Sequence, residues 1–412
     1  MENTESQRRN APSCSRIREA LGLDRNIAVM SAAVFLVGAG EELWTRFIPK
    51  YLQALGASAA IVGLFGTADD LLDALYQYPG GYLSDRIGSR RALVLFAGIA
   101  TVGYATYSLS PRWPMVFVGL VFVSAWSSMG SPAIFAMIAE RLPNNRRAMG
   151  FTVQSILKRL PVMVSPVIGG VLIATFGLVQ GVRIALIATI GLALTSIVGQ
   201  RWLYAQTVQG ENHEPLGLLS QFRELDSRLK RLLLSDILIR TCEGMAGVFI
   251  VLFVTNIVGL NAPQFGSLVS IQMASSILVY FPAAALGDRI GRRPMVGATF
   301  LCFSAFPLAV ILARDYLTMA LAFIVGGLRE LGEPARKAMI VDLANPGRRG
   351  RTVGLYYLIR SLSVTPAAAI GGLLWQVRPS IPFIVASGVG VLGTFVFWVT
   401  VRSDPRSLTK AQ

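Results

Sequence analysis

Hydrophobic stretches of about 20 residues follow one another along nearly the whole chain, separated by short polar or basic segments. An α-helix needs a stretch of this length to cross the hydrocarbon core of a bilayer. Backbone groups in hydrocarbon must satisfy their own hydrogen bonds, so these stretches form helices; a membrane barrel would show short alternating segments instead. We expect twelve spans, at residues 26–48, 59–81, 92–110, 113–139, 149–174, 181–204, 232–257, 264–286, 294–313, 316–341, 352–376 and 380–401.

A polar stretch in the middle of the chain divides six spans from six. It contains charged residues, a proline and the single histidine, and we expect it to be a cytoplasmic linker with an amphipathic helix. The predicted organisation is a cytoplasmic N-terminal tail, a six-helix half, the linker, a second six-helix half and a cytoplasmic C-terminal tail. These parts cover residues 1–25, 26–204, 205–231, 232–401 and 402–412.

The composition excludes a soluble protein. Hydrophobic residues make up 53% of the chain and charged residues only 15%, whereas a soluble chain carries about 25% charged residues. The net charge of +15 would suggest a nucleic-acid partner in a soluble protein. Here the basic residues lie between apolar spans, so membrane topology explains them, and we expect a lipid bilayer and no nucleic acid as partner.

The distribution of basic residues predicts the orientation. With the N-terminus in the cytoplasm, four inner loops carry three arginines each: Arg86, Arg90 and Arg91; Arg141, Arg146 and Arg147; Arg289, Arg292 and Arg293; and Arg348, Arg349 and Arg351. The opposite loops carry Lys50, Arg112, Arg314 and Arg378. The positive-inside rule therefore predicts an integral protein of the cytoplasmic (inner) cell membrane with both termini inside. Residues 1–25 have no apolar region typical of a signal peptide, so we expect the first span to remain as an anchor.

The sequence offers little for enzymatic or metal chemistry. Cys14, Cys242 and Cys302 are scattered without metal-ligand spacing, and His213 is the only histidine. No set of nucleophile and base and no phosphate-binding loop is present. We expect neither an enzyme nor a cofactor or metal site.

The second six spans repeat the first at an offset of 202 to 203 residues. The segment from Asp85 to Gly88 recurs from Asp288 to Gly291, and the segment from Gly130 to Ile138 resembles that from Gly332 to Ile340. Two homologous halves related by an axis along the membrane normal are typical of a carrier that works by alternating access, with the solute site between the halves near mid-membrane.

Two loops carry a family resemblance. The segment from Gly81 to Arg91, GYLSDRIGSRR, resembles the signature loop after the second helix of the major facilitator superfamily, and LGDRIGRR from Leu286 to Arg293 is similar to its second copy. The resemblance covers residues 26–401 and implies an all-α integral membrane protein with twelve transmembrane helices in two pseudo-symmetric halves. It also implies that these loops latch a gate, at Gly81, Asp85, Arg86, Gly88, Arg91, Asp288, Arg289, Gly291 and Arg293.

A second segment bears on the direction of transport. Residues Ser165 to Gly170, SPVIGG, resemble the Gly-Pro-x-x-Gly-Gly segment of the superfamily's exporters, with serine in place of the first glycine. The same residues also suit a helix-packing face. The arginine that such exporters carry in the fourth span has no counterpart in the stretch from Trp126 to Gly130. The repeat-equivalent position in the tenth span does hold Arg329, at an offset of 202 from Ser127.

Charged residues within the spans are the candidate site. An ionisable side chain at mid-helix costs about 2.5 to 3.5 kcal/mol, so each must face a partner, a water-filled cavity or an interface. We place on the solute or proton path Glu41, Glu42, Asp70, Asp73, Trp126, Lys158, Arg240, Glu243, Arg329, Glu330, Glu333 and Arg360. For Asp236, Arg336 and Lys337, near cytoplasmic helix ends, we expect snorkelling.

The repeat predicts two ion pairs. Glu41 and Glu243 are equivalent at an offset of 202, as are Lys158 and Arg360. Spans one and five, and seven and eleven, are neighbours in the family that the chain resembles. We therefore expect Glu41 to pair with Lys158 and Glu243 with Arg360, either as structural pairs or with one carboxylate on a proton path.

The functional prediction is a monomeric secondary transporter of a small organic solute, with protons as coupling ion, that exports an amphipathic compound. Uptake or exchange of an organic anion is the alternative, favoured by Lys158, Arg159, Arg240, Arg329 and Arg360. Cation transport through the acids of the second span and a non-transporting membrane receptor are further alternatives.

Overall fold

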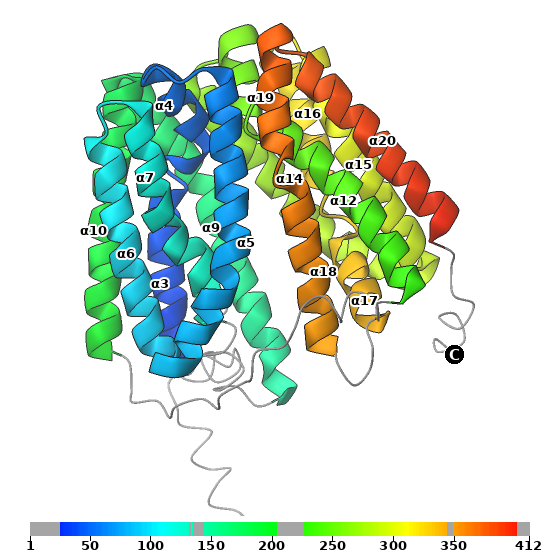
Figure 1. The fold of residues 1–412 in the computed structure, drawn as a ribbon, viewed down its shortest axis with the longest axis horizontal. Coiled ribbons are helices and arrows are strands. Elements are labelled where there is room, and N and C mark those ends of the chain that lie inside the picture. The colour runs from blue at the N-terminus through cyan, green and yellow to red at the C-terminus, as the bar shows by residue number, and fades with distance from the viewer. Residues whose placement is uncertain (1–24, 132, 135–143, 204–225, 344–348, 402–412) are drawn as a thin grey trace, which may run out of the picture.

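The computed structural model describes residues 25–131, 133–134, 144–203, 226–343 and 349–401, and all regular secondary structure in this part of the chain is helical (Figure 1). Residues 1–24, 204–225 and 402–412, which include most of the predicted tails and linker and His213, lie outside the described residues. The N-terminal half contains α3 (Arg25–Glu41), η1 (Thr45–Phe47), α4 (Ile48–Ala54), α5 (Ala59–Ile87), α6 (Ser89–Leu109), α7 (Trp113–Ser124), η2 (Ala125–Met129), α9 (Asn144–Phe176) and α10 (Leu178–Leu203).

The C-terminal half repeats this order of helices. Its elements are α12 (Ser227–Gly247), α13 (Ile250–Leu252), η3 (Phe253–Ile257), α14 (Ala262–Ile290), α15 (Arg292–Leu312), α16 (Tyr316–Leu328), α17 (Glu333–Asp342), α18 (Arg349–Val364), α19 (Ala367–Val377) and α20 (Ile381–Thr400). Each predicted span contains at least one of these helices, so the predicted all-helical, two-half fold is confirmed. The fifth span starts earlier than predicted, at Asn144, and the seventh at Ser227.

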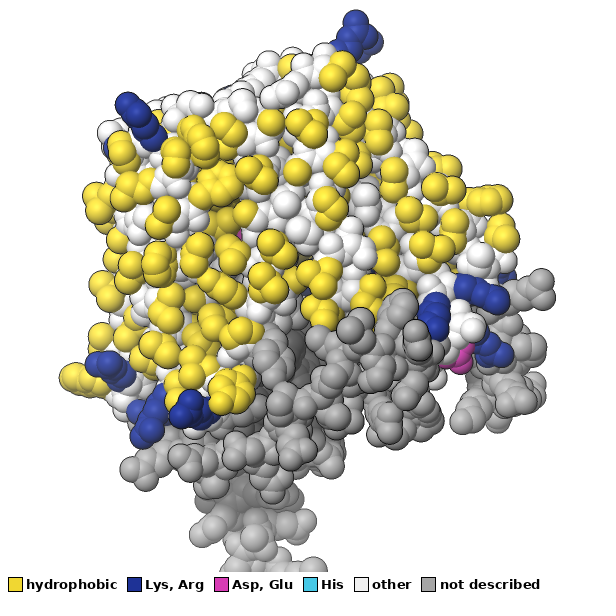
Figure 2. All heavy atoms as spheres, viewed as in Figure 1, with side chains coloured by type: hydrophobic (Ala, Val, Ile, Leu, Met, Phe, Trp, Pro, Cys, Tyr) yellow, Lys and Arg dark blue, Asp and Glu magenta, His cyan; other side chains and the backbone are white. Residues whose placement is uncertain are grey.

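The outer surface is suited to lipid. Figure 2 shows apolar side chains over the sides of both bundles, with lysines and arginines gathered toward the two ends. Large hydrophobic side chains are widely exposed on it, for example Leu278 at 73% and Phe395 at 63%. Eight helices of the described part are long and apolar enough to cross a membrane, and Trp113–Met129 forms a shorter apolar helix. The protein is therefore an integral membrane protein.

The two halves are packed together at one end. Figure 1 shows the two bundles converging at the end where α4 and the start of α5 lie and diverging toward the loop after α5. Two seams join them there, α9 against α14 and α5 against α19. Glycines make the seams tight: a Cβ on Gly63 would overlap the backbone of Ala368 and Gly372, and one on Gly266 would overlap the backbone of Pro166. We call this end the closed end; the predicted orientation puts it outside.

Candidate functional site

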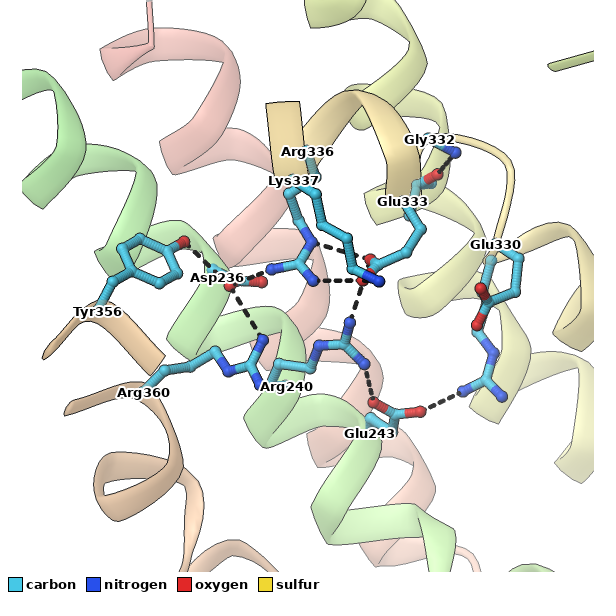
Figure 3. Close-up of polar contacts among 12 residues, drawn as sticks. Asp236, Arg240, Glu243, Glu330, Gly332, Glu333, Arg336, Lys337, Tyr356 and Arg360 are labelled. Carbon is cyan, nitrogen blue, oxygen red and sulfur yellow. Dashed lines mark hydrogen bonds and ion pairs between the residues drawn. The ribbon is translucent and has the colours of Figure 1, made fainter. Parts of the chain in front are cut away.

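A charge network occupies the C-terminal half (Figure 3). Its centre is Asp236 on α12 and Arg336 on α17, whose side chains are 1% and 2% exposed and lie 2.5 Å apart. Tyr356 on α18 donates its hydroxyl to Asp236 at 3.0 Å, and Arg360 lies 3.6 Å from the same carboxylate. The buried Asp236 carboxylate thus faces two arginines and one hydroxyl group, which offset the cost of burying its charge.

The network continues along α12. Arg240 pairs with Glu243 at 2.7 Å and with Glu333 on α17 at 3.3 Å, and Arg329 reaches Glu243 at 3.3 Å. The guanidinium groups of Arg240 and Arg329 also lie over the ring of Phe303, 5.1 and 4.9 Å from its centroid. Each of the three network acids, Asp236, Glu243 and Glu333, therefore has at least one arginine partner.

The tenth span is broken at the network. Helix α16 ends at Leu328 and α17 begins at Glu333, with Pro334 in the first turn. Proline has no N–H group, so residue 334 cannot donate to the carbonyl of Glu330, and the helix restarts instead of continuing. The N–H of Gly332 donates to the hydroxyl of Thr299 at 2.5 Å, which satisfies one donor at the break. The break places Arg329 and Glu333 toward α12, while Glu330 contacts the other half.

The N-terminal half carries acids with different partners. The hydroxyl of Tyr104 donates to Glu41 at 2.7 Å, and the Trp44 ring packs edge-on against Tyr104 and Tyr107. Gln77 donates to Asp73 at 3.3 Å, one turn along α5. Among the described residues no ion pair joins an arginine or lysine to Glu41, Asp69, Asp70 or Asp73. The neighbouring Glu42 pairs with Arg46 at 3.3 Å.

The predicted pairing of Glu243 with Arg360 is wrong in this conformation, whereas Glu41 and Lys158 lie close enough for their charges to interact without a direct ion pair. Arg360 pairs with Asp236, about two turns before Glu243 on α12, because Glu243 is held by Arg240 and Arg329. Glu41 binds Tyr104, and within the described part of the chain no ion pair joins it to Lys158. The repeat preserves the positions of the charges but not their partners, since α3 ends at Glu41 whereas α12 continues to Gly247.

Two further predictions need correction. Asp236 and Arg336 do not snorkel, because both side chains are buried against each other. Lys337 is 58% exposed and lies 3.6 Å from Glu333, as snorkelling would allow. Trp126 is buried in η2, a π-helical turn in the core of its half, so its contact with a solute stays a prediction.

An ion pair between the halves does not follow from the sequence. Arg159 on α9 lies 3.1 Å from Glu330 in the break of the tenth span and donates to Ser276 on α14 at 2.6 Å. The sequence marks Arg159 as a buried charge, but spacing within one half indicates neither its partner nor its position between the halves.

The gate loops are described in part. Gly88 and Gly291 have φ angles of +84° and +88°, a conformation that glycine adopts without a Cβ clash, and each separates two long helices. The following basic residues bind helix ends: Arg90 donates to the carbonyl of Arg201 at 2.9 Å and Arg293 to that of Trp398 at 2.6 Å. Arg86 and Arg91 are exposed. The side chains of Asp85, Asp288 and Arg289 lie outside the described part, and the latch role of Gly81 and these loops stays a prediction.

Two helix bundles that pack together at one end, with ionised side chains inside the membrane-spanning helices, define the class of secondary transporters. The chain belongs to the Major Facilitator Superfamily, whose family model matches residues 30–235 and 232–412. It is a transporter of small-molecule solutes and not an enzyme.

The relatives agree with this assignment. An uncharacterized MFS-type transporter of Methanocaldococcus jannaschii is 22% identical over 395 residues, which are 90% of this chain and 93% of that one. The multidrug resistance protein MdtH of Cronobacter sakazakii is 22% identical over 360 residues, 84% of this chain and 86% of that one. The crystal structure of a mutant of the nucleoside transporter NupG matches with a TM-score of 0.76 at 12% identity, covering 92% of this chain and 100% of that one, which shows a shared fold.

Proposed function

We propose that the protein is a monomer that exports an amphipathic organic compound across the cytoplasmic membrane in exchange for protons, with both termini in the cytoplasm. The observation that carries the proposal is the contrast between the two halves. The described C-terminal network neutralises its own acids with arginines, whereas Glu41, Asp70 and Asp73 have no ion-pair partner among the described residues.

This contrast favours the N-terminal acids as the proton carriers. A carboxylate inside the membrane needs either a cation or a proton to be stable. An acid paired with arginines is already neutralised by their positive charge, so it has little tendency to bind a proton. Glu41, whose described partner is the neutral hydroxyl of Tyr104, can exchange a proton without breaking an ion pair. Asp70 lies close enough to Glu243 for their charges to interact, which brings the N-terminal acids near the other half.

Export is supported by the relative named as a multidrug resistance protein and by the segment SPVIGG in α9. Because the seams block the closed end, a solute can reach the space between the halves from the opposite end. The predicted orientation places that end in the cytoplasm. Solute would then bind at deprotonated acids in the inward-facing state. After the halves rotate and open the site to the outside, protonation of these acids would release the solute.

The test is transport by the purified protein in liposomes with an imposed pH gradient and a panel of cationic, neutral and anionic amphipathic dyes. We expect uphill movement of at least one dye that stops when a protonophore collapses the gradient. Glu41→Gln should abolish uphill movement while retaining downhill exchange, because the binding space remains and the proton site is lost. Asp342→Asn is the matched control and should keep uphill transport, because it removes a carboxylate that pairs with Arg292 and lies outside the predicted solute and proton path.

The same assay distinguishes the alternatives. Gradient-independent exchange of organic anions, lost in Arg240→Gln and Arg329→Gln, would favour the anion carrier. Four arginines line the C-terminal network, but each already has a carboxylate partner, which is why we place this function second. Solute binding without any flux would favour a receptor.

A further inference from the structure

The seam between α9 and α14 has a graded character along its length. At the closed end it is built from small residues: a Cβ on Gly170 would overlap the backbone of Ala262, and one on Gly266 that of Pro166. One to two turns further in, Ser270 donates to the carbonyl of Met163 at 2.5 Å. The innermost described bonds across the seam are those from Arg159 to Ser276 and Glu330. Arg159 lies about 16 Å along α9 from Gly170, at 1.5 Å per residue.

The Arg159 contacts differ from the rest of the seam. Ser276 is 3% exposed, and the Arg159 and Glu330 side chains are 26% and 36% exposed, so the ion pair is partly removed from water. Three helical segments from two halves meet at one guanidinium group: α9, α14 and the break between α16 and α17. Glu330 directly follows Arg329, which belongs to the charge network through Glu243.

We propose that Arg159, Glu330 and Ser276 form a tie between the halves that stabilises the conformation with the closed end shut, and that the tie breaks when this end opens. Opening the closed end requires α9 and α14 to separate where their backbones are in contact. In the proposed tie, that separation also moves Arg159 out of the range in which it lies 2.6 Å from Ser276 and 3.1 Å from Glu330, unless α16 and α17 move with α9. Arg159 and Glu330 are therefore positioning residues that set the balance between the two conformations.

The chemistry of the tie allows a rescue experiment. Ser276 can donate as well as accept a hydrogen bond, so it can serve an arginine or a carboxylate at position 159. Exchanging the two charges, Arg159→Glu with Glu330→Arg, therefore recreates an ion pair across the same seam with the same neighbour. A role confined to charge balance within one half would not be restored by this exchange.

The experiment measures distances between spin labels in lipid nanodiscs, without solute or pH gradient. The full-length chain carries Cys14, Cys242 and Cys302 replaced by alanine, and one of two label pairs at exposed positions. Ala54→Cys with Ile257→Cys reports on the closed end, and Trp202→Cys with Val341→Cys on the opposite end. In Arg159→Gln and Glu330→Gln we expect more molecules whose closed end has opened. Their ratio to molecules whose closed end is shut should rise about fivefold or more, and the distance between the two labels at the opposite end should shorten in the same molecules. Ser276→Ala should shift the ratio in the same direction by less.

Asp342→Asn is the matched control for Glu330→Gln, since it removes a carboxylate charge from an ion pair with Arg292 within one half. Its distance at the closed end should equal that of the unaltered chain. The charge exchange should return both distances to the original distribution. The proposal is overturned if the single variants give the same closed-end distances as Asp342→Asn, or if the charge exchange is shifted as far as the single variants. If a single variant does not fold, the charge exchange and Ser276→Ala decide the outcome. The tie is rejected if the distances in Ser276→Ala equal those of the unaltered chain and the charge exchange is shifted or unfolded. Because no proton or solute is involved, failure of the exporter proposal would leave this result unchanged.

Discussion

Asp236 and Arg336 illustrate how much depends on the partner of a charge inside the membrane. Each side chain is almost fully buried, and the pair is completed by Tyr356, Glu333 and Arg360. Removing two buried charges together can leave the fold intact, whereas removing one strands the other in a medium that solvates it poorly.

We predict that Arg336→Met lowers the free energy of unfolding by about 3 to 5 kcal/mol, and that Asp236→Leu with Arg336→Met recovers a large part of the loss. Glu333 and Arg360 lose a partner in the double variant, so recovery should be incomplete. Thermal unfolding in detergent measures the effect, with Asp342→Asn as a control that changes an exposed ion pair. A double variant less stable than Arg336→Met would show that the two residues do not stabilise each other.

A smaller loss of stability is expected for the buried Tyr356, which belongs to the same cluster. Tyr356→Phe removes one neutral hydroxyl that donates to Asp236, and this should cost about 1 to 2 kcal/mol. The same unfolding measurement detects it. A cost as large as that of Arg336→Met would mean that Tyr356 contributes more than one hydrogen bond.

The sequence identifies most of these residues but not their partners. The cost of a buried charge marks Glu243, Arg329 and Glu333 without any structure. The expectation that Arg336 would reach the membrane surface fails because Asp236, one hundred residues earlier, comes within 2.5 Å of it. Distances across helices depend on packing, which spacing along one chain segment does not contain.

At the scale of single elements, α16 begins with a capping box. The N–H and hydroxyl of Thr318 both donate to the Asp315 carboxylate at 2.8 Å, and these bonds hold the pKa of Asp315 below its usual value. The stabilisation from a carboxylate with a lowered pKa is present above its unfolded pKa and is lost as pH falls through its folded pKa.

We therefore expect the first turn of α16 to lose protection against hydrogen exchange as the medium becomes acidic enough to protonate Asp315. Asp315→Asn should keep a pH-independent cap, because asparagine caps helices without titrating. Exchange of the amides from Tyr316 to Met319, corrected for the intrinsic rate, measures this. Equal loss of protection in both proteins at low pH would assign the effect to another group.

The seam between α5 and α19 gives another element-scale prediction. Gly63→Ala places a methyl group against the backbone of Ala368 and Gly372, where nothing flexible can yield. We expect the closed end to open more often, measured with the label pair at 54 and 257, and transport to slow. Gly191→Ala in α10, where a Cβ meets open space, should behave like the unaltered chain. An unshifted distance in Gly63→Ala would show that the seam tolerates an extra carbon.

Helix breaks account for much of what the sequence cannot predict at this scale. The apolar pattern predicts one helix for the first span, but the helix breaks after Glu41, and the tenth span breaks between Leu328 and Glu333. Pro334 indicates the second break, whereas no proline lies between Glu41 and Phe47 to indicate the first. These breaks redirect the acids of each half, which is why equivalent positions have different partners.

For the whole molecule, the internal repeat and the length of the apolar stretches are sufficient to predict twelve helices in two halves. The contacts between the halves are not predictable in this way, because no repeat relates Arg159 to Glu330. Orientation still rests on the distribution of arginines.

The orientation has a direct test. In intact cells, on a background without native cysteines, Asn145→Cys and Gly347→Cys should resist a membrane-impermeant thiol reagent, whereas Val377→Cys, at a 71% exposed position, should react. Permeabilised cells provide the control in which all three sites are free to react. Labelling at position 145 from outside would reverse the orientation and, with it, the direction assigned to transport.

The two arginines that bind helix ends have a mechanical consequence. Arg90 attaches the start of the third span to the end of the sixth, and Arg293 attaches the ninth to the twelfth, so each bundle is fastened to itself at the same end. Such fastening resists bending within a half, and motion is directed to the surfaces where the halves meet. We therefore expect each half to turn as a rigid body, so that arginines of the loops on which the predicted orientation rests also stiffen the two moving parts.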